Sequence, residues 1–223
     1  MSQPLAERLR PRTLDDYIGQ KHLVGEGAVL RRMIESGRIS SFILWGPPGV
    51  GKTTLAQIIA HRLETPFYTL SAVTSGVKDV RDVIERAQKG RFFNEASPIL
   101  FIDEIHRFSK SQQDSLLGAV ERGIVTLIGA TTENPSFEVI RPLLSRCQLY
   151  VLKSLEKDDL LQLLHRAVTT DAELKDIAAL KTEYLLLEKL GYEVSDEERK
   201  TANGEYLKEL LATAPEMPGG GNE

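Results

Sequence analysis

The 223-residue sequence is poor in cysteine and in long apolar runs. Its single cysteine, Cys147, cannot form a disulfide framework and suits a small buried apolar group in a reducing compartment. No apolar run approaches membrane-spanning length, and the opening residues MSQPLAERLRPRTL are too polar for a secretory signal. We therefore expect a soluble cytoplasmic protein without a membrane partner.

Excess charge of one sign is also missing. The formal net charge is −4, which excludes a strongly basic nucleic-acid binder but not a local basic stripe. A hydrophobic content of 41% is enough to bury a core. The histidines have no metal-ligand spacing, so no zinc site is predicted; they are His22, His61, His106 and His165.

Short apolar runs alternate with amphipathic stretches over the first two thirds of the chain. The runs predict strands at 42–45, 67–70, 99–102, 125–130 and 149–152. The stretches between them predict helices at 53–63, 77–89 and 112–121. This alternation is typical of an α/β fold, here a parallel five-stranded sheet with helices on both faces.

The pattern changes after Lys153. Ser154 is a candidate N-cap for a helix at 155–168, and further helices are predicted at 174–190 and, after a capping box, at 195–213. The residues from 214 to 223 have no apolar periodicity, so we expect a disordered tail. The predicted domains are an α/β domain at 1–153 and an all-helical segment at 154–213.

A complete phosphate-binding pattern, GPPGVGKT, follows the first predicted strand and precedes a helix. Its glycines let backbone N–H groups face a triphosphate, Lys52 reaches the β- and γ-phosphates, and Thr53 offers a hydroxyl to Mg²⁺. A chance glycine turn is the alternative, and the strand–loop–helix context argues against it. The sequence therefore predicts ATP and Mg²⁺ as ligands, bound by Gly46, Pro47, Pro48, Gly49, Val50, Gly51, Lys52, Thr53 and Thr54.

Two carboxylates end the strand-like run ILFIDE. Asp103 is placed to hold Mg²⁺ through its water shell, and Glu104 to polarise the attacking water. Ligands of α/β sheets bind at the carboxyl ends of strands, where this pair falls. The alternative is that both acids cap the following helix. The phosphate-binding pattern about 50 residues upstream favours the catalytic interpretation.

Several longer segments resemble one family. RPRTLDDYIGQKHLV, SAVTSGVKDVRDVIERA, ILFIDEIHRFSKSQQDSLLGAVERG and TLIGATTENPSFEV are similar to the replication-associated recombination protein A family of AAA+ ATPases. The resemblance runs from about Arg10 to Val168. SAVTSGVK, HRFSKSQQD and GATTENPSFE resemble this family rather than clamp-loader subunits or RuvB-type branch-migration motors.

The resemblance implies further roles. Thr132 matches the first sensor of the γ-phosphate, and Arg146 matches an arginine finger that completes a neighbouring subunit's active site, which implies an oligomer. Without the resemblance, Thr132 is a strand-end residue and Arg146 a surface ion-pair residue. The adenine pocket is implied at Tyr17, Ile18 and Gly19.

The family's activity implies an ATPase acting in DNA replication, recombination and repair. Implied partners are forked, gapped or single-strand/double-strand junction DNA, other copies or full-length paralogue subunits, and single-strand binding protein, in a cytoplasmic, nucleoid-associated setting. The loop at 106–110, which follows the two carboxylates, offers basic and aromatic groups to DNA, with a solvated loop as the simpler interpretation.

The resemblance stops near Asp171. The family's lid motif G-D-A-R-x-x-L-N and its tetramerisation domain have no counterpart in the sequence. An alternative function is therefore a truncated nucleotide-binding module with little turnover that modulates full-length subunits. A clamp-loader or RuvB-like subunit is a third possibility, against which the family-specific segments argue.

Overall fold

The computed structural model describes residues 4–92 and 96–171. It contains two compact units. One is Arg10–Asp159, and the other includes the described residues 4–9 and 160–171. The predicted helices at 174–190 and 195–213 and the predicted tail lie outside the described residues.

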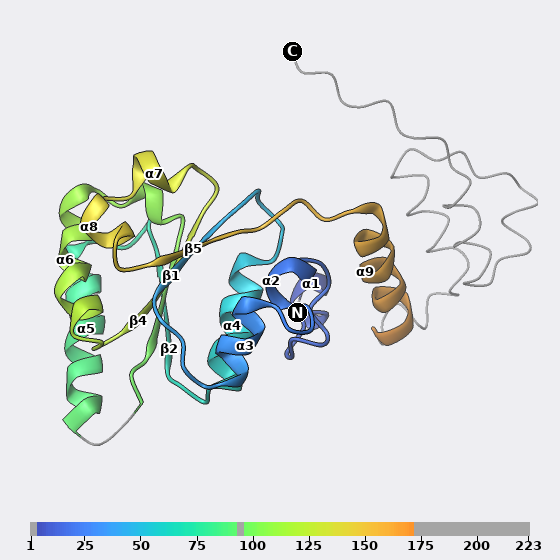
Figure 1. Cartoon of the computed structure of the whole chain (residues 1–223), viewed down its shortest axis with the longest axis horizontal. Helices are drawn as coiled ribbons and strands as arrows, with labels where there is room; N and C mark the ends of the chain where they lie inside the picture. The colour runs from blue at the N-terminus through green and yellow to red at the C-terminus, as the bar shows by residue number, and fades with distance from the viewer. Residues whose placement is uncertain (1–3, 93–95, 172–223) are drawn as a thin grey trace, which may run out of the picture. The chain divides into compact units, whose positions relative to one another are not determined.

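The Arg10–Asp159 unit is built on a five-stranded sheet. Its strands are β1 (Phe42–Trp45), β2 (Phe67–Ser71), β3 (Ile99–Asp103), β4 (Thr126–Thr131) and β5 (Gln148–Val151). They pair in the order β2-β3-β4-β1-β5, and every pair is parallel (Figure 1). The predicted fold class is confirmed, and each predicted strand lies within one residue of its observed bounds.

Helices cover both faces of this sheet (Figure 1). Because side chains alternate along a strand, Phe42 and Leu44 pack toward α3 (Val29–Glu35) and α4 (Lys52–Arg62). The intervening Ile43 packs on the opposite face, in the core that also holds residues of α5 (Val77–Phe92) and α6 (Lys110–Glu121). Burial on both faces explains why the strands read as continuous apolar runs.

The core that holds residues of α5 and α6 also determines the protonation state of the single cysteine. Cys147 packs against it, half-buried, and burial raises the pKa of its thiol to about 11. The thiol is therefore protonated at neutral pH, as expected for a packing residue rather than a nucleophile.

Several one-turn helices have no counterpart in the sequence-based predictions. They are α2 (Lys21–Val24), η1 (Ile105–Arg107), α7 (Pro135–Glu138) and α8 (Arg141–Leu144). A single turn is too short to show an apolar period, and tertiary contacts rather than intrinsic propensity stabilise it. Three of them, η1, α7 and α8, follow β3 and β4 and shape the site described below.

The unit formed by both ends of the described chain contains α1 (Leu5–Arg8) and most of α9 (Lys157–Thr170). Arg8 donates two hydrogen bonds to the Asp171 carboxylate, at 2.7 and 2.9 Å. The predicted N-cap at Ser154 is wrong, because α9 begins only at Lys157 and the Asp159 carboxylate accepts the Glu156 N–H at 3.1 Å. In the described part of the chain, no helix combines the length and apolarity needed to cross a membrane.

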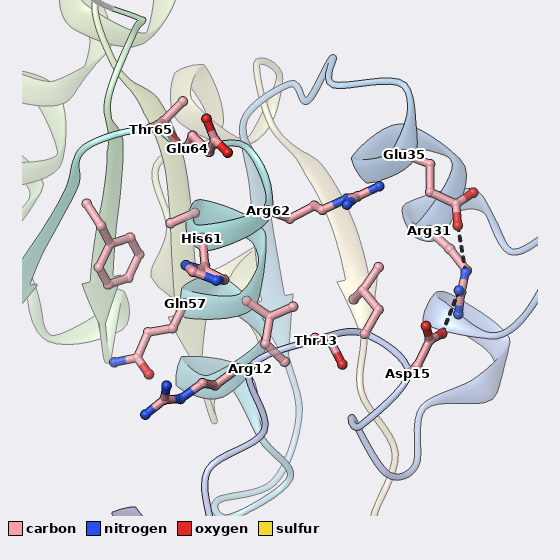
Figure 2. A pocket seen from close by; sticks show the side chains of 14 residues that line it. Arg12, Thr13, Asp15, Arg31, Glu35, Gln57, His61, Arg62, Glu64 and Thr65 are labelled. Atoms are coloured by element: carbon pink, nitrogen blue, oxygen red, sulfur yellow. Dashed lines mark hydrogen bonds and ion pairs between the residues drawn. The ribbon is translucent and has the colours of Figure 1, made fainter.

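A hollow of about 750 Å³ lies beside the C-terminal half of α4 (Figure 2). Gln57, His61 and Arg62 line it together with the segment 12–15. On its rim, Arg31 donates to Asp15 at 2.7 Å and to Glu35 at 2.8 Å. The predicted phosphate loop lies at the other end of α4, about 15 Å along the helix, so this hollow is not the predicted nucleotide site.

Candidate nucleotide site

The predicted site residues meet at one edge of the sheet because the strands that carry them are parallel and in register. Trp45, the last residue of β1, pairs with Thr131 at the end of β4. Ile102 of β3 pairs with Gly129 of β4, which brings Asp103 to the same edge. The phosphate loop after β1, the acids after β3 and the threonines of β4 therefore converge.

The geometry of the phosphate loop requires glycine at several positions. The Gly46 N–H donates to the Thr131 carbonyl at 3.2 Å, and a Cβ on Gly46 would lie 2.4 Å from the Leu152 carbonyl oxygen. Gly49 and Gly51 have φ angles of 77° and 94°, which L-residues rarely adopt. The pattern GPPGVGKT thus forms a loop whose backbone wraps tightly before α4. Pro47 and Pro48 are exposed, Val50 is buried and Thr54 is half-buried.

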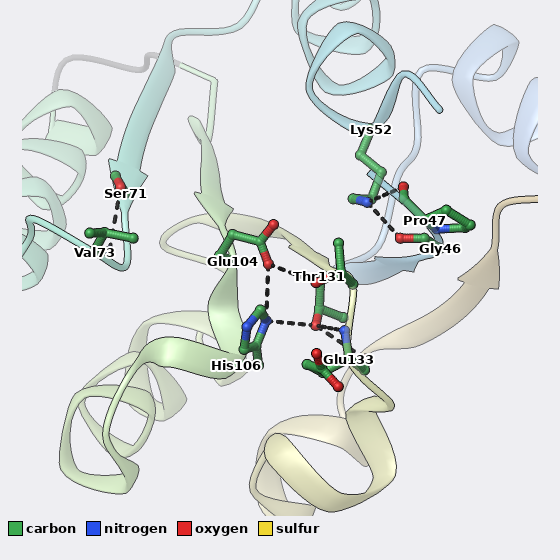
Figure 3. A network of polar contacts seen from close by, with 10 residues as sticks. Gly46, Pro47, Lys52, Ser71, Val73, Glu104, His106, Thr131 and Glu133 are labelled. Carbon is green, nitrogen blue, oxygen red and sulfur yellow. Dashed lines mark hydrogen bonds and ion pairs between the residues drawn. The ribbon is translucent and has the colours of Figure 1, made fainter. Parts of the chain in front are cut away.

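Lys52 and Thr53 occupy the first turn of α4, at the mouth of this loop. The Lys52 ammonium donates to the carbonyls of Gly46 and Pro47, each at 2.7 Å (Figure 3). Burial lowers the pKa of Lys52, and the nearby Glu104 and Asp103 carboxylates raise it. Thr53 is half-buried directly beside it. A cation and a hydroxyl are therefore held at the helix N-terminus, where backbone N–H groups favour an anion.

Tyr17 packs against the phosphate loop and bonds its backbone. Its ring is 8% exposed, and its hydroxyl lies 3.1 Å from the Val50 carbonyl oxygen and 3.3 Å from that of Gly51. A Cβ on Gly51 would lie 2.6 Å from that hydroxyl. The predicted adenine segment thus contacts the phosphate loop directly. Ile18 is half-buried, and Gly19 has a φ of 83°.

Asp103 and Glu104 lie at the end of β3 in different environments. Burial raises the pKa of Asp103, the Glu104 carboxylate adds to this, and a backbone hydrogen bond with Glu104 and the Lys52 charge oppose it. Glu104 has a φ of 53°, a left-handed conformation that is uncommon for a residue with a side chain. Such a conformation costs about 1–3 kcal/mol and clusters at functional sites.

A polar network joins Glu104 to the end of β4 (Figure 3). Thr132 donates its hydroxyl to Glu104 Oε2 at 3.3 Å, and His106 Nδ1 lies 3.1 Å from the same oxygen. His106 Nδ1 also lies 3.0 Å from the Thr131 hydroxyl, which bonds both the carbonyl and the N–H of Glu133. The structure brings the predicted sensor Thr132 into contact with the predicted base.

Sequence reasoning missed two members of this network. From the sequence, His106 is considered only as a metal ligand and as part of the loop at 106–110 that could contact DNA, and Thr131 is assigned no role. His106 follows Glu104 by two residues, and η1 folds this segment back so that its ring meets the carboxylate. The sequence does show a polar side chain two residues after the predicted base. Only the one-turn helix η1, however, determines that this side chain points toward the carboxylate.

Arg146 is placed apart from this network, after α8. Its guanidinium pairs with Glu121 at the end of α6 and donates to the Pro142 carbonyl at 2.6 Å and to the Ser145 hydroxyl at 3.1 Å. None of these contacts is with the phosphate loop. Its side chain is 36% exposed, so it is accessible from outside the chain.

The loop at 106–110 is ordered rather than freely solvated. Phe108 is only 3% exposed, so its ring is not available to stack on a base, and the DNA hypothesis loses its aromatic group. Ser109 and Gln112 form a capping box that begins α6. Arg107 and Lys110 remain exposed.

Comparisons with known proteins agree with this geometry. Residues 42–155 match the family model of the ATPase family associated with various cellular activities (AAA). The chain is 54% identical over 165 residues to replication-associated recombination protein A of Haemophilus influenzae and 55% identical over 166 residues to that of Escherichia coli K12. Each alignment covers 74% of this chain and 37% of the relative, so the chain spans little more than a third of these relatives' length.

Solved structures share the fold. The RuvB Holliday junction branch migration motor of Thermotoga maritima matches with a TM-score of 0.60 and 33% identity, covering 72% of this chain and 54% of that one. The identity is higher to the recombination proteins than to this motor, which confirms the predicted resemblance and disfavours a RuvB-like subunit. The family model spans the phosphate loop, both acids, the β4 threonines and Arg146, and the chain accordingly belongs to the AAA family of ATPases.

Proposed function

We propose that this chain binds ATP with Mg²⁺, hydrolyses the ATP, and acts on DNA in replication-associated recombination or repair. One observation carries the proposal. Three parallel strands bring a phosphate loop with a buried lysine, a desolvated aspartate and a hydrogen-bonded glutamate to one edge of the sheet. Phosphoryl transfer needs positioning and charge stabilisation, and this edge offers both.

The donor set fits a nucleotide with a hard cation. Mg²⁺ in nucleotide sites takes one or two protein oxygens and completes its shell with phosphate and water. Thr53 and Asp103 offer a hydroxyl and a carboxylate of this kind. Within the described residues, no three histidine, cysteine or acidic side chains gather into an all-protein cage. When bound, Mg²⁺ neutralises charge developing on the β- and γ-phosphates.

The roles of the other residues follow from their contacts. When ATP binds, the Lys52 ammonium gives up its hydrogen bonds to the loop carbonyls and donates to phosphate oxygens instead. A charge-assisted bond to an anion is stronger than one to a neutral carbonyl. Glu104 accepts the proton of the attacking water, and Thr132 holds the Glu104 carboxylate and faces the γ-phosphate. The loop Gly46–Thr54 binds the phosphates, and Tyr17, Ile18 and Gly19 line the nucleotide from the opposite side.

Arg146 acts on a neighbouring subunit in this proposal. Its contacts are with α6 and the end of α8, so it serves another copy rather than its own phosphate loop. This requires an oligomer of this chain or of a full-length paralogue. The proposed DNA partners are forks, gaps and strand junctions, with single-strand binding protein alongside, in the cytoplasm at the nucleoid. The similarity to replication-associated recombination proteins supports a role in this process.

Steady-state ATP hydrolysis tests the proposal. Turnover of the purified chain is measured with and without forked or gapped DNA, beside Glu104→Gln as the blank. Mg²⁺-dependent turnover that DNA stimulates and the variant lacks is the expected result. ATP binding without turnover above that of Glu104→Gln would contradict hydrolysis. It would favour the alternative function, a nucleotide-binding module with little turnover. Lys52→Ala, which removes the phosphate cation, is expected to lose binding itself.

A further inference from the structure

His106 contacts the predicted base but has no place in the roles set out above. Its side chain is 13% exposed, so the ring is largely buried and its orientation is constrained. Nδ1 lies 3.1 Å from Glu104 Oε2 and 3.0 Å from the Thr131 hydroxyl. Both partners lie within hydrogen-bond distance of one nitrogen, so the ring joins the ends of β3 and β4.

The surrounding bonds determine which ring nitrogen carries the proton. Thr131 donates its only hydroxyl proton to the Glu133 carbonyl at 3.1 Å, so toward His106 it accepts. The ionised Glu104 carboxylate has no proton to give and also accepts. Nδ1 therefore carries a proton, donates it to the Thr131 hydroxyl and lies 3.1 Å from the Glu104 carboxylate. The network thus assigns the Nδ1–H tautomer to His106.

These contacts act on one carboxylate oxygen only. Oε2 of Glu104 accepts the Thr132 hydrogen bond and makes the 3.1 Å contact with His106 Nδ1, and the dashed contacts in Figure 3 reach this oxygen alone. Oε1 makes no hydrogen bond within the described part of the chain. Holding Oε2 fixes the plane of the carboxylate and leaves Oε1 to accept a proton.

Glu104 needs this support because its backbone does not supply it. The residue is the left-handed N-cap of a three-residue 3₁₀ helix, and its side chain is 29% exposed. A carboxylate with three rotatable bonds at such a position samples many orientations unless side-chain contacts select one. A misplaced reacting group costs up to roughly a hundredfold in rate.

We propose that His106 is a positioning residue for hydrolysis: its Nδ1 edge, in contact with Glu104 Oε2 at 3.1 Å, holds that oxygen and so aims Oε1 at the attacking water. This inference rests on the proposed ATPase function. It differs from a packing role, because it depends on a donor at the Nδ1 position rather than on the volume of the ring. It also acts through Glu104 and not on the nucleotide.

Three substitutions separate these roles. In His106→Asn the amide Nδ2 donates from nearly the Nδ1 position, in His106→Gln the amide lies one bond further out, and His106→Ala has no donor. We expect kcat to fall roughly 10–100-fold in the Ala and Gln variants, with unchanged ATP affinity, and to stay within a few-fold of wild type in the Asn variant. His61→Asn and His61→Ala, at the far end of α4, are the matched controls.

A double-mutant comparison tests whether His106 acts through Glu104. In the Glu104→Gln background, His106→Ala is expected to change the residual rate little, because the group that it positions is already lost. A wild-type kcat in His106→Ala, or equal losses in the Asn and Ala variants, would overturn the inference. So would a loss of ATP affinity, which would place His106 at the nucleotide.

A readout independent of turnover keeps the two proposals distinguishable. Nitrogen-15 NMR of the histidine rings in the full chain reports the tautomer directly, with His106→Asn assigning the signal. We expect an Nδ1–H ring whose shifts move in Glu104→Gln. An Nε2–H tautomer, or shifts insensitive to Glu104, would refute the positioning role even if the wild-type chain hydrolysed no ATP. Absent turnover with the expected tautomer would refute the proposed function alone.

Discussion

At the scale of single residues, the phenol of Tyr17 shows how one buried hydroxyl supports a flexible loop. Burial raises the pKa of this phenol, so it stays protonated and donates to the Val50 and Gly51 carbonyls. The loop otherwise owes its shape to glycines with positive φ, which hold it weakly. Tyr17 therefore links the predicted adenine segment to the predicted phosphate segment.

Tyr17→Phe tests this link. Removing the hydroxyl while keeping the ring is expected to weaken ATP binding by up to about tenfold, because a hydrogen bond of this kind contributes about 0.5–1.5 kcal/mol. Titration with a fluorescent ATP analogue measures the change. Tyr68→Phe on β2 is the control, since the Tyr68 hydroxyl bonds no described residue. Unchanged affinity in Tyr17→Phe would mean that only its ring contributes.

Asp103 makes a second prediction at this scale, on stability. Its pKa is raised in the folded chain, so the charged form is disfavoured by folding. Stability is therefore highest where the carboxyl is protonated, and it falls as pH rises from the ordinary value of 3.8 through the raised pKa. In EDTA at pH 8, Asp103→Asn is expected to unfold a few degrees above the wild type.

Thermal scans at several pH values measure the effect. The difference between Asp103→Asn and wild type should shrink as the pH approaches 4, where the wild-type carboxyl also binds a proton. Asp114→Asn, at an exposed position on α6, is the control and should show no such trend. A less stable Asp103→Asn protein at pH 8 would show that the carboxylate is satisfied without a metal.

At the scale of elements, one side chain joins four of them. Gln113 of α6 is fully buried, and its amide donates to the Phe108 carbonyl at 3.0 Å and to the Glu138 carbonyl at 3.1 Å. It accepts the Ile140 N–H at 2.9 Å. One glutamine thereby satisfies the backbone after η1, at the end of α7 and before α8. These are the short elements that carry His106 and lead to Arg146.

Gln113→Leu keeps the approximate volume and leaves three backbone groups, one in a buried and two in part-buried hydrogen bonds, without that partner. Each unsatisfied group costs about 1–3 kcal/mol, so we expect a clear loss of stability by urea unfolding and a lower kcat from disorder around Glu104. Gln88→Leu on α5 is the matched control, because Gln88 makes no side-chain hydrogen bond to described residues. Equal stability of the two variants would mean that water replaces the glutamine.

The elements also show what a sequence can and cannot predict. Strands and long helices were predictable because burial on both faces of a sheet leaves continuous apolar runs in the sequence. Lys52, Asp103 and Glu104 were predictable because spacing along the chain marks them. The contact between His106 and Glu104 was not predictable, because it depends on a left-handed residue and one turn of 3₁₀ helix, and neither leaves a periodic pattern. Ser154 failed as a cap because α9 begins only at Lys157, three residues further along the chain.

At the scale of the whole molecule, the proposed function calls for a second cation that reaches the γ-phosphate from a neighbouring copy. Lys52 supplies one positive charge from within the phosphate loop. The guanidinium of Arg146 is exposed and paired with Glu121, and an exposed pair of this kind contributes only about 0–1 kcal/mol to stability. Exchanging this pair for a phosphate of a second copy, as the proposed function requires, would therefore cost little stability.

Mixing two inactive variants tests this arrangement. Glu104→Gln keeps the finger but loses the base, and Arg146→Ala keeps the base but loses the finger. If Arg146 serves a neighbour, the mixture hydrolyses ATP although neither variant does so alone, and its specific activity rises with total protein concentration. The double variant, mixed with either single one, is the control and should add nothing. An active Arg146→Ala protein would show that Arg146 is not an arginine finger. An inactive mixture in which both variants bind ATP and associate would mean that Arg146 serves only its own chain.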